Sequence, residues 1–318
     1  MENKKKMQSL FKKFKMKDDA SVLTQRSRNE KILFGVVFAV FFVYGISMLM
    51  PFIFLGLNSL KDLLEYAVDL QAGNVMALPD NIWKGLENYV YAFREMKVDG
   101  TYGNVIYLPE MIFNSLVYIG FSIFSSLTAS SLVAYCLAKY RFKLHGFLYG
   151  IAIFSMTIPI VGTSGASLKL AYDLGTYNTL FYTILPSFGG FGGGFLVLYG
   201  YFRNIPWSYA EAVFIDGGGH GTVFFKIMLP QASPALLTLG IMSFIGGWNN
   251  YTTPLMYMPD YPTLASGLYK VEQSFTRDNA NFPAYFAGLM LATIPVVVVF
   301  AAFSDVIMKN FSVGGLKG

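Results

Sequence analysis

Residues 211–230 read "EAVFIDGGGHGTVFFKIMLP" and lie between two strongly apolar regions of the chain. Two carboxylates, three consecutive glycines, a histidine and a lysine precede a closing Leu-Pro pair. Ala210, Val213 and Phe214 fall on one helical face, and Gly217 suits the position just beyond a helix end. We therefore expect a short helix, a sharp glycine turn and a second helical piece.

The flanks of this stretch predict where its helices begin and end. Pro206 suits a first helical position, because its missing N–H costs nothing there. Ser208 and Glu211 have the spacing of a capping box. We expect the second helical piece to cover 222–228 and to end at the Leu-Pro pair. Taken alone, the pattern is typical of an ordinary pair of capped interfacial helices.

The composition indicates that much of the surface faces lipid. Of the 318 residues, 54% are hydrophobic and only 14% are charged, whereas soluble domains carry about 25% charged residues. A single cysteine, Cys136, excludes a disulfide framework and a cysteine-based metal site. His145 and His220 have no companions at ligand spacing, so no metal site is predicted. No phosphate-binding GxxxxGK[ST] loop and no Ser/His/Asp grouping is present, so the chain is not expected to be an enzyme.

Six apolar windows are long enough to cross a bilayer, which takes about 20 apolar residues. They cover 32–57, 111–138, 147–170, 180–202, 232–251 and 285–307. Basic residues favour the cytoplasmic side, and ten of the 24 lysines and arginines lie in the first 31 residues. Residues 58–110 hold four basic and eight acidic side chains. We therefore expect both termini in the cytoplasm and the 58–110 loop outside, which argues against a nucleic-acid partner.

This topology divides the chain into five parts. They are a basic cytoplasmic tail (1–31), a first spanning helix (32–57), an extracytoplasmic loop (58–110), a core with the other five spanning helices and a cytoplasmic 204–230 segment (111–307), and a cytoplasmic C-terminal tail (308–318). Within the loop, "LPDNIWKGLENYVYAF" predicts an amphipathic helix at the membrane interface. The sequence thus predicts an all-α polytopic membrane protein.

The opening stretch resembles the EAA loop of bacterial ABC importer permeases. That motif is Glu-Ala-Ala, three residues, Gly, nine residues, Ile, one residue, Leu-Pro. The matching positions are Glu211, Ala212, Val213, Gly217, Ile227, Leu229 and Pro230. Every spacing is kept, and one residue departs: Val213 stands where the motif has Ala. Valine adds bulk at a position where the resemblance implies close packing.

Further stretches extend the resemblance over about 114–318. They are "NSLVYIGFSIFSSLTASSLVAYCLAKYRF", "YFRNIPWSYAEA", "FIGGWNNYTTPLMYM" and the terminal "GGLKG". The chain looks most like the smaller, maltose-permease-type partner of a heterodimer in the carbohydrate branch. The resemblance implies a type I ABC importer permease fold with six transmembrane helices, a cytoplasmic coupling helix, and a place in the bacterial cytoplasmic membrane.

The resemblance also implies partners and roles. The partners are a second permease of different sequence, two ATPase subunits that bind ATP and Mg, an extracytoplasmic solute-binding protein, a sugar or oligosaccharide, and membrane lipid. This chain itself would hold no cofactor. Glu211 would be the charged contact or cap at the ATPase, Ala212 the close-packing residue, and Asp216 and Gly217 the helix end that fixes the turn.

Two sets of residues are weaker candidates. Trp248, Asn249, Asn250 and Tyr251 suit a sugar pathway, since aromatic rings and amides fit the two kinds of surface that sugars present. An interfacial aromatic belt explains the same residues and is favoured. Gly315 and Lys317 would reach the ATPase by resemblance to the maltose relatives, whereas a frayed terminus explains the tail equally well.

Other functions stay open at this point. The same architecture would serve a polyol, a glycerol phosphate or an amino acid. An autonomous secondary carrier or channel would move solute without an added ATPase, although the scarcity of intramembrane charge argues against one. An embedded hydrolase, the least favoured alternative, would turn over substrate in detergent without a partner.

Overall fold

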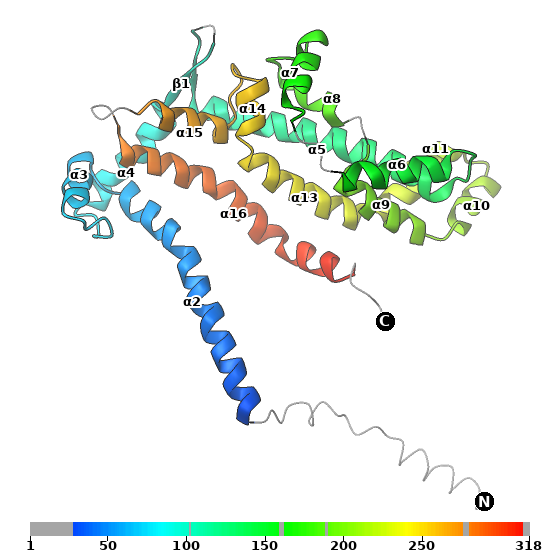
Figure 1. Cartoon of the computed structure of the whole chain (residues 1–318), viewed down its shortest axis with the longest axis horizontal. Coiled ribbons are helices and arrows are strands. Elements are labelled where there is room, and N and C mark those ends of the chain that lie inside the picture. Colours follow the sequence, from blue (N-terminus) through cyan, green and yellow to red (C-terminus); the bar gives the residue numbers. More distant parts are fainter. Residues whose placement is uncertain (1–27, 102, 159–161, 188–189, 276–279, 314–318) are drawn as a thin grey trace, which may run out of the picture. The chain divides into compact units, whose positions relative to one another are not determined.

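The computed structural model describes residues 28–101, 103–158, 162–187, 190–275 and 280–313. Contacts divide the chain into two compact units, 1–54 and 55–318. Most of the chain that the structure describes is helical, with one two-stranded antiparallel sheet (Figure 1).

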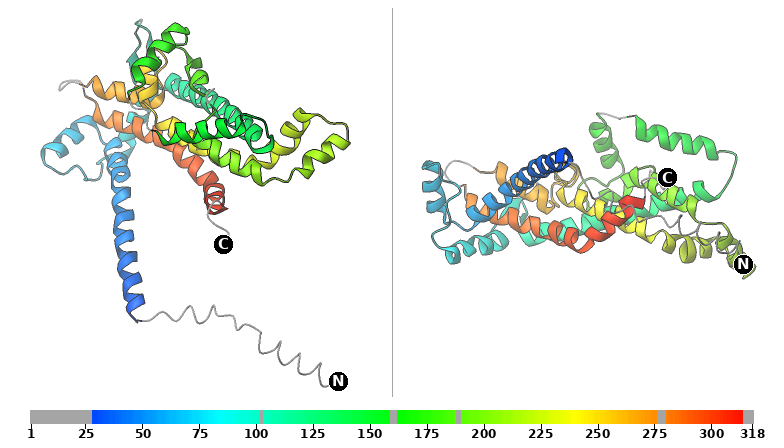
Figure 2. Two further views of the ribbon diagram at one scale, coloured as in Figure 1. Left: turned by 45° about the vertical axis from the view of Figure 1, so that its right-hand side comes forward. Right: turned by 90° about the horizontal axis from the view of Figure 1, so that it is seen from below.

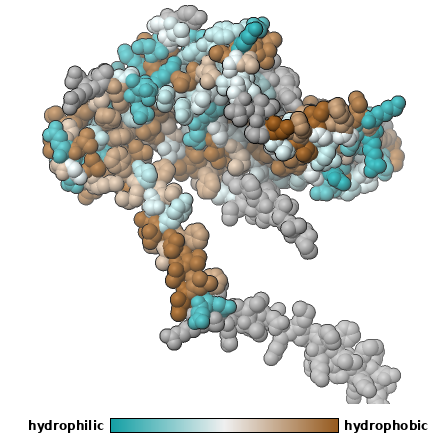
Figure 3. Space-filling view, viewed as in Figure 1, coloured by the Kyte–Doolittle hydropathy of each residue, from teal (hydrophilic) through white to brown (hydrophobic). Residues whose placement is uncertain are grey.

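Helix α2 (Arg28–Ser59) covers the predicted first spanning window. From residue 32 its side chains are apolar on every side, and residues 29–53 are all exposed (Figure 3). A helix that is apolar all round belongs in a protein core or in lipid. The exposure of Phe34, among others, therefore fits a membrane-spanning segment.

The predicted 58–110 loop folds into four elements. They are α3 (Leu63–Gln71), α4 (Ile82–Arg94), β1 (Lys97–Asp99) and β2 (Val105–Tyr107). Helix α4 covers the predicted amphipathic stretch, with Gly85 and Ala92 buried and Trp83 exposed. The sequence did not predict the hairpin, whose register pairs Val98 with Ile106.

An ion pair between a buried lysine and a half-buried aspartate anchors this region. Lys61 has no exposed surface, and its Nζ donates to the Asp69 carboxylate at 2.6 Å. Asn88 Nδ2 donates to the Lys61 carbonyl at 2.8 Å. Gly85 allows α4 to pack closely against the backbone of Leu60. Any larger residue would clash there, because its Cβ would lie 1.9 Å from the Leu60 carbonyl oxygen.

Helix α5 (Leu108–Lys139) is the axis of the second unit. It contacts α4, β2, α9 (Gly193–Asn204), α13 (Ser233–Asn249) and α15 (Leu264–Gln273). Helix α13 also packs on α16 (Phe282–Val313), and α5, α13 and α16 run side by side in both views of Figure 2. At 1.5 Å per residue, α5 is about 48 Å long, so its two ends meet different parts of the unit.

Two of the six predicted windows are interrupted. The 147–170 window contains α6 (His145–Thr157) and α7 (Ser164–Asp173), and the left-handed Gly162 (φ 84°) stands just before α7. The 180–202 window contains η2 (Leu180–Thr183), α8 (Ile184–Ser187) and the start of α9, with the left-handed Gly190 (φ 64°) between the helices. The third and fourth windows are therefore not single straight helices.

Within the described ranges, three helices are long and apolar enough to cross a membrane. They are Asn29–Ser59, Leu108–Lys139 and Phe282–Asp305. The bent pair His220–Gln231 and Ser233–Asn249 makes a fourth when it is taken as one span. The count of six spans stays a prediction. The last helix also continues to Val313, beyond the predicted boundary at 307.

Candidate functional site

The first arm of the 204–230 segment is α10 (Ser208–Ile215). Ala210 is fully buried, and Val213 and Phe214 are half-buried, as the helical pattern predicts. The opposite side presents Glu211 and Ala212 to solvent, and Ile215 is 85% exposed. Helix α10 therefore offers a small surface with one charge, one small residue and one large apolar side chain.

The start of α10 corrects two predictions. Trp207 occupies the N-cap position, so Pro206 lies outside the helix and Ser208 is its first residue. The capping box is not formed, because Ser208 sits one position too late to accept from the third helical N–H. The Trp207 carbonyl instead accepts from the backbone N–H groups of Ala210 (2.8 Å) and Glu211 (3.2 Å).

The end of α10 confirms the predicted glycine turn. Gly217 is left-handed, with φ 77°. Its N–H donates to the Phe214 carbonyl at 3.0 Å, and the Gly218 N–H donates to the Val213 carbonyl at 2.8 Å. These two bonds form a Schellman motif, which satisfies the last carbonyls of the helix. Asp216, the C-cap residue, is exposed beside the turn.

Gly218 makes room for the valine that departs from the EAA motif. A Cβ at Gly218 would lie 2.5 Å from Val213 Cγ1 and 3.0 Å from the Val213 carbonyl oxygen. The first distance is too short for a contact between two non-bonded carbon atoms. The extra bulk of Val213 is therefore accommodated inside the turn.

The second arm is helical from His220 to Gln231. It consists of α11 (His220–Thr222), the π-helix η3 (Val223–Met228) and α12 (Leu229–Gln231). The predicted stop at Leu229-Pro230 is wrong, because Pro230 lies in the first turn of α12, where its missing N–H is tolerated. The arm then bends by 69° into α13.

The second arm is anchored on one side. Val223, Phe224 and Met228 are buried, while Ile227 and Leu229 are half-buried. Their core also includes Ala134, Tyr135 and Leu137 of α5, Ala152 of α6, and Phe195, Leu198 and Phe202 of α9. The whole segment thus rests on the Tyr140 end of α5 and on α6 and α9.

Four rings close around the glycine turn. They belong to Tyr140 just after α5, Trp207 before α10, Phe214 in α10 and His220 in α11. The ring centroids of Tyr140 and Trp207 are 5.8 Å apart, those of Trp207 and Phe214 6.2 Å, those of Phe214 and His220 4.9 Å, and those of Tyr140 and His220 5.5 Å. Tyr140 Oη and His220 Nδ1 share a 2.8 Å hydrogen bond. We call these four residues the aromatic ring cluster.

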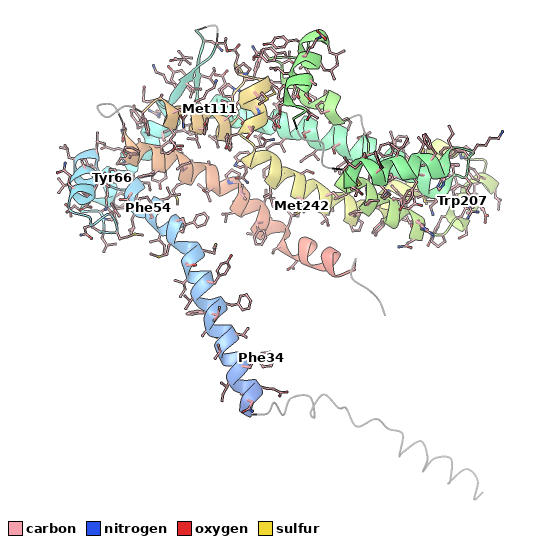
Figure 4. The ribbon with its side chains drawn as sticks, viewed as in Figure 1. Phe34, Phe54, Tyr66, Met111, Trp207 and Met242 are labelled. Carbon is pink, nitrogen blue, oxygen red and sulfur yellow. The ribbon has the colours of Figure 1, made fainter. Side chains whose placement is uncertain are left out.

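Sequence reasoning missed this cluster. Tyr140 and Trp207 lie in stretches that carry the family resemblance, and His220 was considered only as a metal ligand. Figure 4 shows Trp207 at one end of the second unit and Met111, from the first turn of α5, toward the other. Lys139 Nζ also donates to the Ile205 carbonyl, which ties α5 to the approach to α10.

The four pathway candidates have different surroundings. Trp248 is 4% exposed, its Nε1 donates to the Ala292 carbonyl at 2.9 Å, and it packs in the α13–α16 contact. Asn249 is exposed and donates back to its own helix. Asn250 is half-buried and donates to Tyr118 Oη (3.3 Å) and Thr253 Oγ1 (3.0 Å). Tyr251 is 44% exposed and stacks on Tyr269, with centroids 4.9 Å apart. Gly315 and Lys317 lie outside the described residues.

A polar cluster lies near the Leu108 end of α5. Asp260 is 8% exposed and accepts hydrogen bonds from Asn178 Nδ2 (2.5 Å) and from the Thr101 backbone N–H. The Asp260 N–H donates to Asn178 Oδ1 at 3.0 Å. Burial acts to raise the pKa of Asp260, but these hydrogen bonds outweigh it and hold the pKa below its usual value of 3.8. One carboxylate thus joins the hairpin turn, the loop after α7 and the loop after α14 (Thr252–Tyr257).

The amino-acid sequence of the chain is similar to a known family of membrane proteins. Residues 126–313 match the family model described as the binding-protein-dependent transport system inner membrane component. The chain is 28% identical over 255 residues to the arabinooligosaccharides transport system permease protein AraQ of Halalkalibacterium halodurans, covering 79% of this chain and 86% of that protein. It is 25% identical over 283 residues to the diacetylchitobiose uptake system permease protein NgcG of Streptomyces coelicolor, covering 88% and 87%.

A solved structure shares the fold. It is the crystal structure of a bacterial ABC transporter involved in the import of the acidic polysaccharide alginate. The matching chain has a TM-score of 0.71 and 22% identity, with 88% of this chain and 98% of that chain covered. At this identity the likeness bears on the fold alone.

Proposed function

The chain belongs to the binding-protein-dependent transport system inner membrane component family, and from that premise we propose how it works. It forms half of the translocation pathway for a sugar or oligosaccharide in the bacterial cytoplasmic membrane. The 204–230 segment couples this pathway to ATPase subunits in the cytoplasm. A second permease of different sequence, two ATPases and an extracytoplasmic solute-binding protein complete the importer.

The observation that carries the coupling role is the exposed side of α10. Glu211, Ala212 and Ile215 face solvent on a short helix whose opposite side is buried. The Schellman turn and the aromatic ring cluster hold that helix against the rest of the segment. A helix held in this way moves as one body when its partner moves, which is what transmission from an ATPase requires.

The mechanism that we propose divides the work between chains. ATP and Mg are bound by the partner ATPases, whose closure moves α10 and the second arm together. Coupling of this kind is reciprocal. Arrival of loaded binding protein at the outside therefore favours ATPase closure by the same free energy with which closure favours opening of the pathway.

The sugar class rests on the relatives. AraQ and NgcG are named for arabinooligosaccharides and diacetylchitobiose. MelC of Bacillus subtilis, 29% identical over 214 residues, is named for melibiose, raffinose and stachyose. Among the pathway candidates, Asn249 and Tyr251 are the two exposed ones, so we assign sugar contact to them. Trp248 is assigned to helix packing, because its ring and its N–H are both engaged within the chain.

Co-purification tests the coupling role. The tagged chain is extracted from its native host in mild detergent, its companions are identified by mass spectrometry, and ATP hydrolysis is measured. We expect a second permease and an ATPase to accompany the wild-type chain. Glu211→Ala together with Gly217→Ala should release the ATPase and keep the second permease, whereas Glu87→Ala, an exposed carboxylate on α4, should change neither.

A different outcome would favour the secondary carrier. That outcome is a chain that purifies alone under several gentle extractions and moves sugar into vesicles that contain no ATP. Sugar-binding proteins added to the purified complex then distinguish the solute class. Stimulation of hydrolysis by an amino-acid or glycerol-phosphate binding protein, and by no sugar-binding protein, would retain the importer and replace the substrate.

A further inference from the structure

We propose that His220 and Tyr140 are a positioning pair that transmits movement of the 204–230 segment to α5; the proposal rests on the coupling role given above. The pair joins two elements that lie 80 residues apart in sequence through a 2.8 Å hydrogen bond between Tyr140 Oη and His220 Nδ1. The two rings also meet edge to face, with centroids 5.5 Å apart.

The pair reaches both arms of the segment. His220 opens the second arm and also packs against Phe214 of the first arm, with centroids 4.9 Å apart. Tyr140 packs against Trp207, the N-cap residue of the first arm. A displacement of either arm therefore acts on the same two side chains.

Tyr140 is placed to pass that displacement on. Its backbone N–H donates to the Cys136 carbonyl at 3.0 Å, so the residue continues the hydrogen-bond pattern of α5. Its ring also packs against Tyr135 of α5, and the two hydroxyls are 3.2 Å apart. The chain of contacts from His220 to Tyr140 to Tyr135 thus leads from the surface of the segment into the helix.

The exposure of His220 argues that the bond has a role beyond packing. A histidine that served only to fill the core would be buried, whereas His220 is solvent-exposed and yet meets two rings and one hydroxyl. Edge-to-face contacts tolerate small shifts of the rings, while the hydrogen bond holds the tyrosine hydroxyl against one ring nitrogen of the histidine. Together they keep the arms connected to α5 as the segment moves.

His145 provides the matched control. It is the other histidine of the chain, and it also bonds to α5, with Nε2 2.7 Å from the Leu137 carbonyl oxygen. Its ring packs on Phe142, outside the 204–230 segment. His145→Phe therefore removes a histidine bond to the same end of α5 without touching either arm.

The test measures hydrogen exchange in residues 134–144 of the purified complex, with its permease and ATPase partners, with and without Mg-ATP and orthovanadate. The variants are Tyr140→Phe and His220→Phe, which keep both rings and remove the bond, and the double variant. We expect a nucleotide-dependent change of exchange in the wild type, reduced about 3- to 10-fold in each single variant. The double variant should be no worse than either one, and His145→Phe should match the wild type.

Three outcomes overturn the proposal. The wild type shows no nucleotide-dependent change at this end of α5, the single variants keep the full change, or the variants only lower the yield of complex while the complex that remains behaves as wild type. The last would assign the pair to folding alone. Failure of the coupling role is seen separately, as a wild-type chain that brings no ATPase with it.

Discussion

The two ends of α5 are held by different chemistry. Near Leu108, directional polar contacts close long loops: Asp260 binds Asn178 and Thr101, and Ser115 Oγ accepts from the Leu264 N–H at 2.7 Å. Near Tyr140, ring contacts and a glycine turn predominate, beside side-chain hydrogen bonds such as those of Lys139 to the Ile205 carbonyl and of Tyr140 to His220. Directional bonds fix one arrangement, whereas ring contacts survive small displacements. We therefore expect the first end to be the more rigid and the second to carry the movement proposed above.

The largest expected loss of stability comes from breaking the ion pair of Lys61 and Asp69, in the segment that precedes α5. Lys61→Ala leaves the Asp69 carboxylate without the ammonium that faces it. Loss of one partner of a buried pair costs about 3–5 kcal/mol, and we expect the lower end of that range because the Asp69 side chain is 19% exposed. Thermal unfolding in detergent should show a large fall in Tm. The double variant Lys61→Met/Asp69→Leu should recover most of it, because no charge is left uncompensated.

The control for this prediction is the exposed pair of Lys84 and Asp62. Exposed pairs contribute little, since water and salt screen them. Lys84→Ala should therefore leave Tm nearly unchanged. Equal losses for Lys61→Ala and Lys84→Ala would contradict the distinction between the two pairs.

The second prediction removes the carboxylate that joins three loops. Asp260→Ala leaves the half-buried Asn178 amide and the exposed Thr101 N–H without their carboxylate acceptor, and loss of hydrogen bonds to a charged group costs about 1.5–3 kcal/mol. Hydrogen exchange should rise in the 97–107 hairpin and in residues 174–178. Asp260→Asn, which keeps one acceptor oxygen, should lose less. No rise at 174–178 would mean that Asp260 does not hold that loop.

The third prediction concerns the turn at the opposite end. Gly218→Ala places a methyl group against Val213 Cγ1, and overpacking of this kind costs about 1–3 kcal/mol. Adding Val213→Ala should restore much of the loss, because it removes the methyl groups that would clash. Tm and ATPase co-purification report the result. Additive losses in the double variant would show that the two residues do not share this space.

The fourth prediction tests the left-handed residue of the same turn. Gly217→Ala forces a side chain into a positive φ, at a cost of about 1–2 kcal/mol. Gly217→Asn should cost less, because asparagine tolerates this region. The Tm values of the two variants give the order. An alanine variant as stable as the wild type would argue against the Schellman turn.

The smallest effect is a pH dependence at the polar end. The folded state lowers the pKa of Asp260 below 3.8, so its contribution is fully present above the unfolded value and is lost as the pH falls through the folded value. The Tm difference between the wild type and Asp260→Asn should stay constant from pH 7 to about pH 5 and narrow below about pH 4. A difference that persists unchanged to about pH 3 would contradict the assignment.

Local features of the 204–230 segment followed from its sequence. The buried face of Ala210, Val213 and Phe214 and the turn at Gly217 depend on helix period and glycine geometry, which a short window contains. The capping box failed within the same window, because Ser208 serves equally well as a cap or as a first helical residue. In the structure Trp207, whose ring packs against Tyr140, occupies the N-cap position instead.

Long-range features did not follow from the sequence. The bond between Tyr140 and His220 spans 80 residues, and the contact of Asp260 with Thr101 spans 159. Composition placed the apolar windows, but it did not show that 147–170 and 180–202 are broken into shorter helices. Hydropathy averages over a window and is insensitive to a single left-handed glycine.

The 69° bend between the second arm and α13 has a mechanical consequence. Ala232, at the bend, is fully buried, so the corner is held while both limbs extend from it. The second arm and α13 are then two rigid helices joined at a fixed bend, so a displacement of one rotates the other about that bend. Helix α13 has 17 residues, which at 1.5 Å per residue is about 25 Å. A rotation of about 5° at the corner would therefore carry its far end, where Asn249 lies, through about 2 Å.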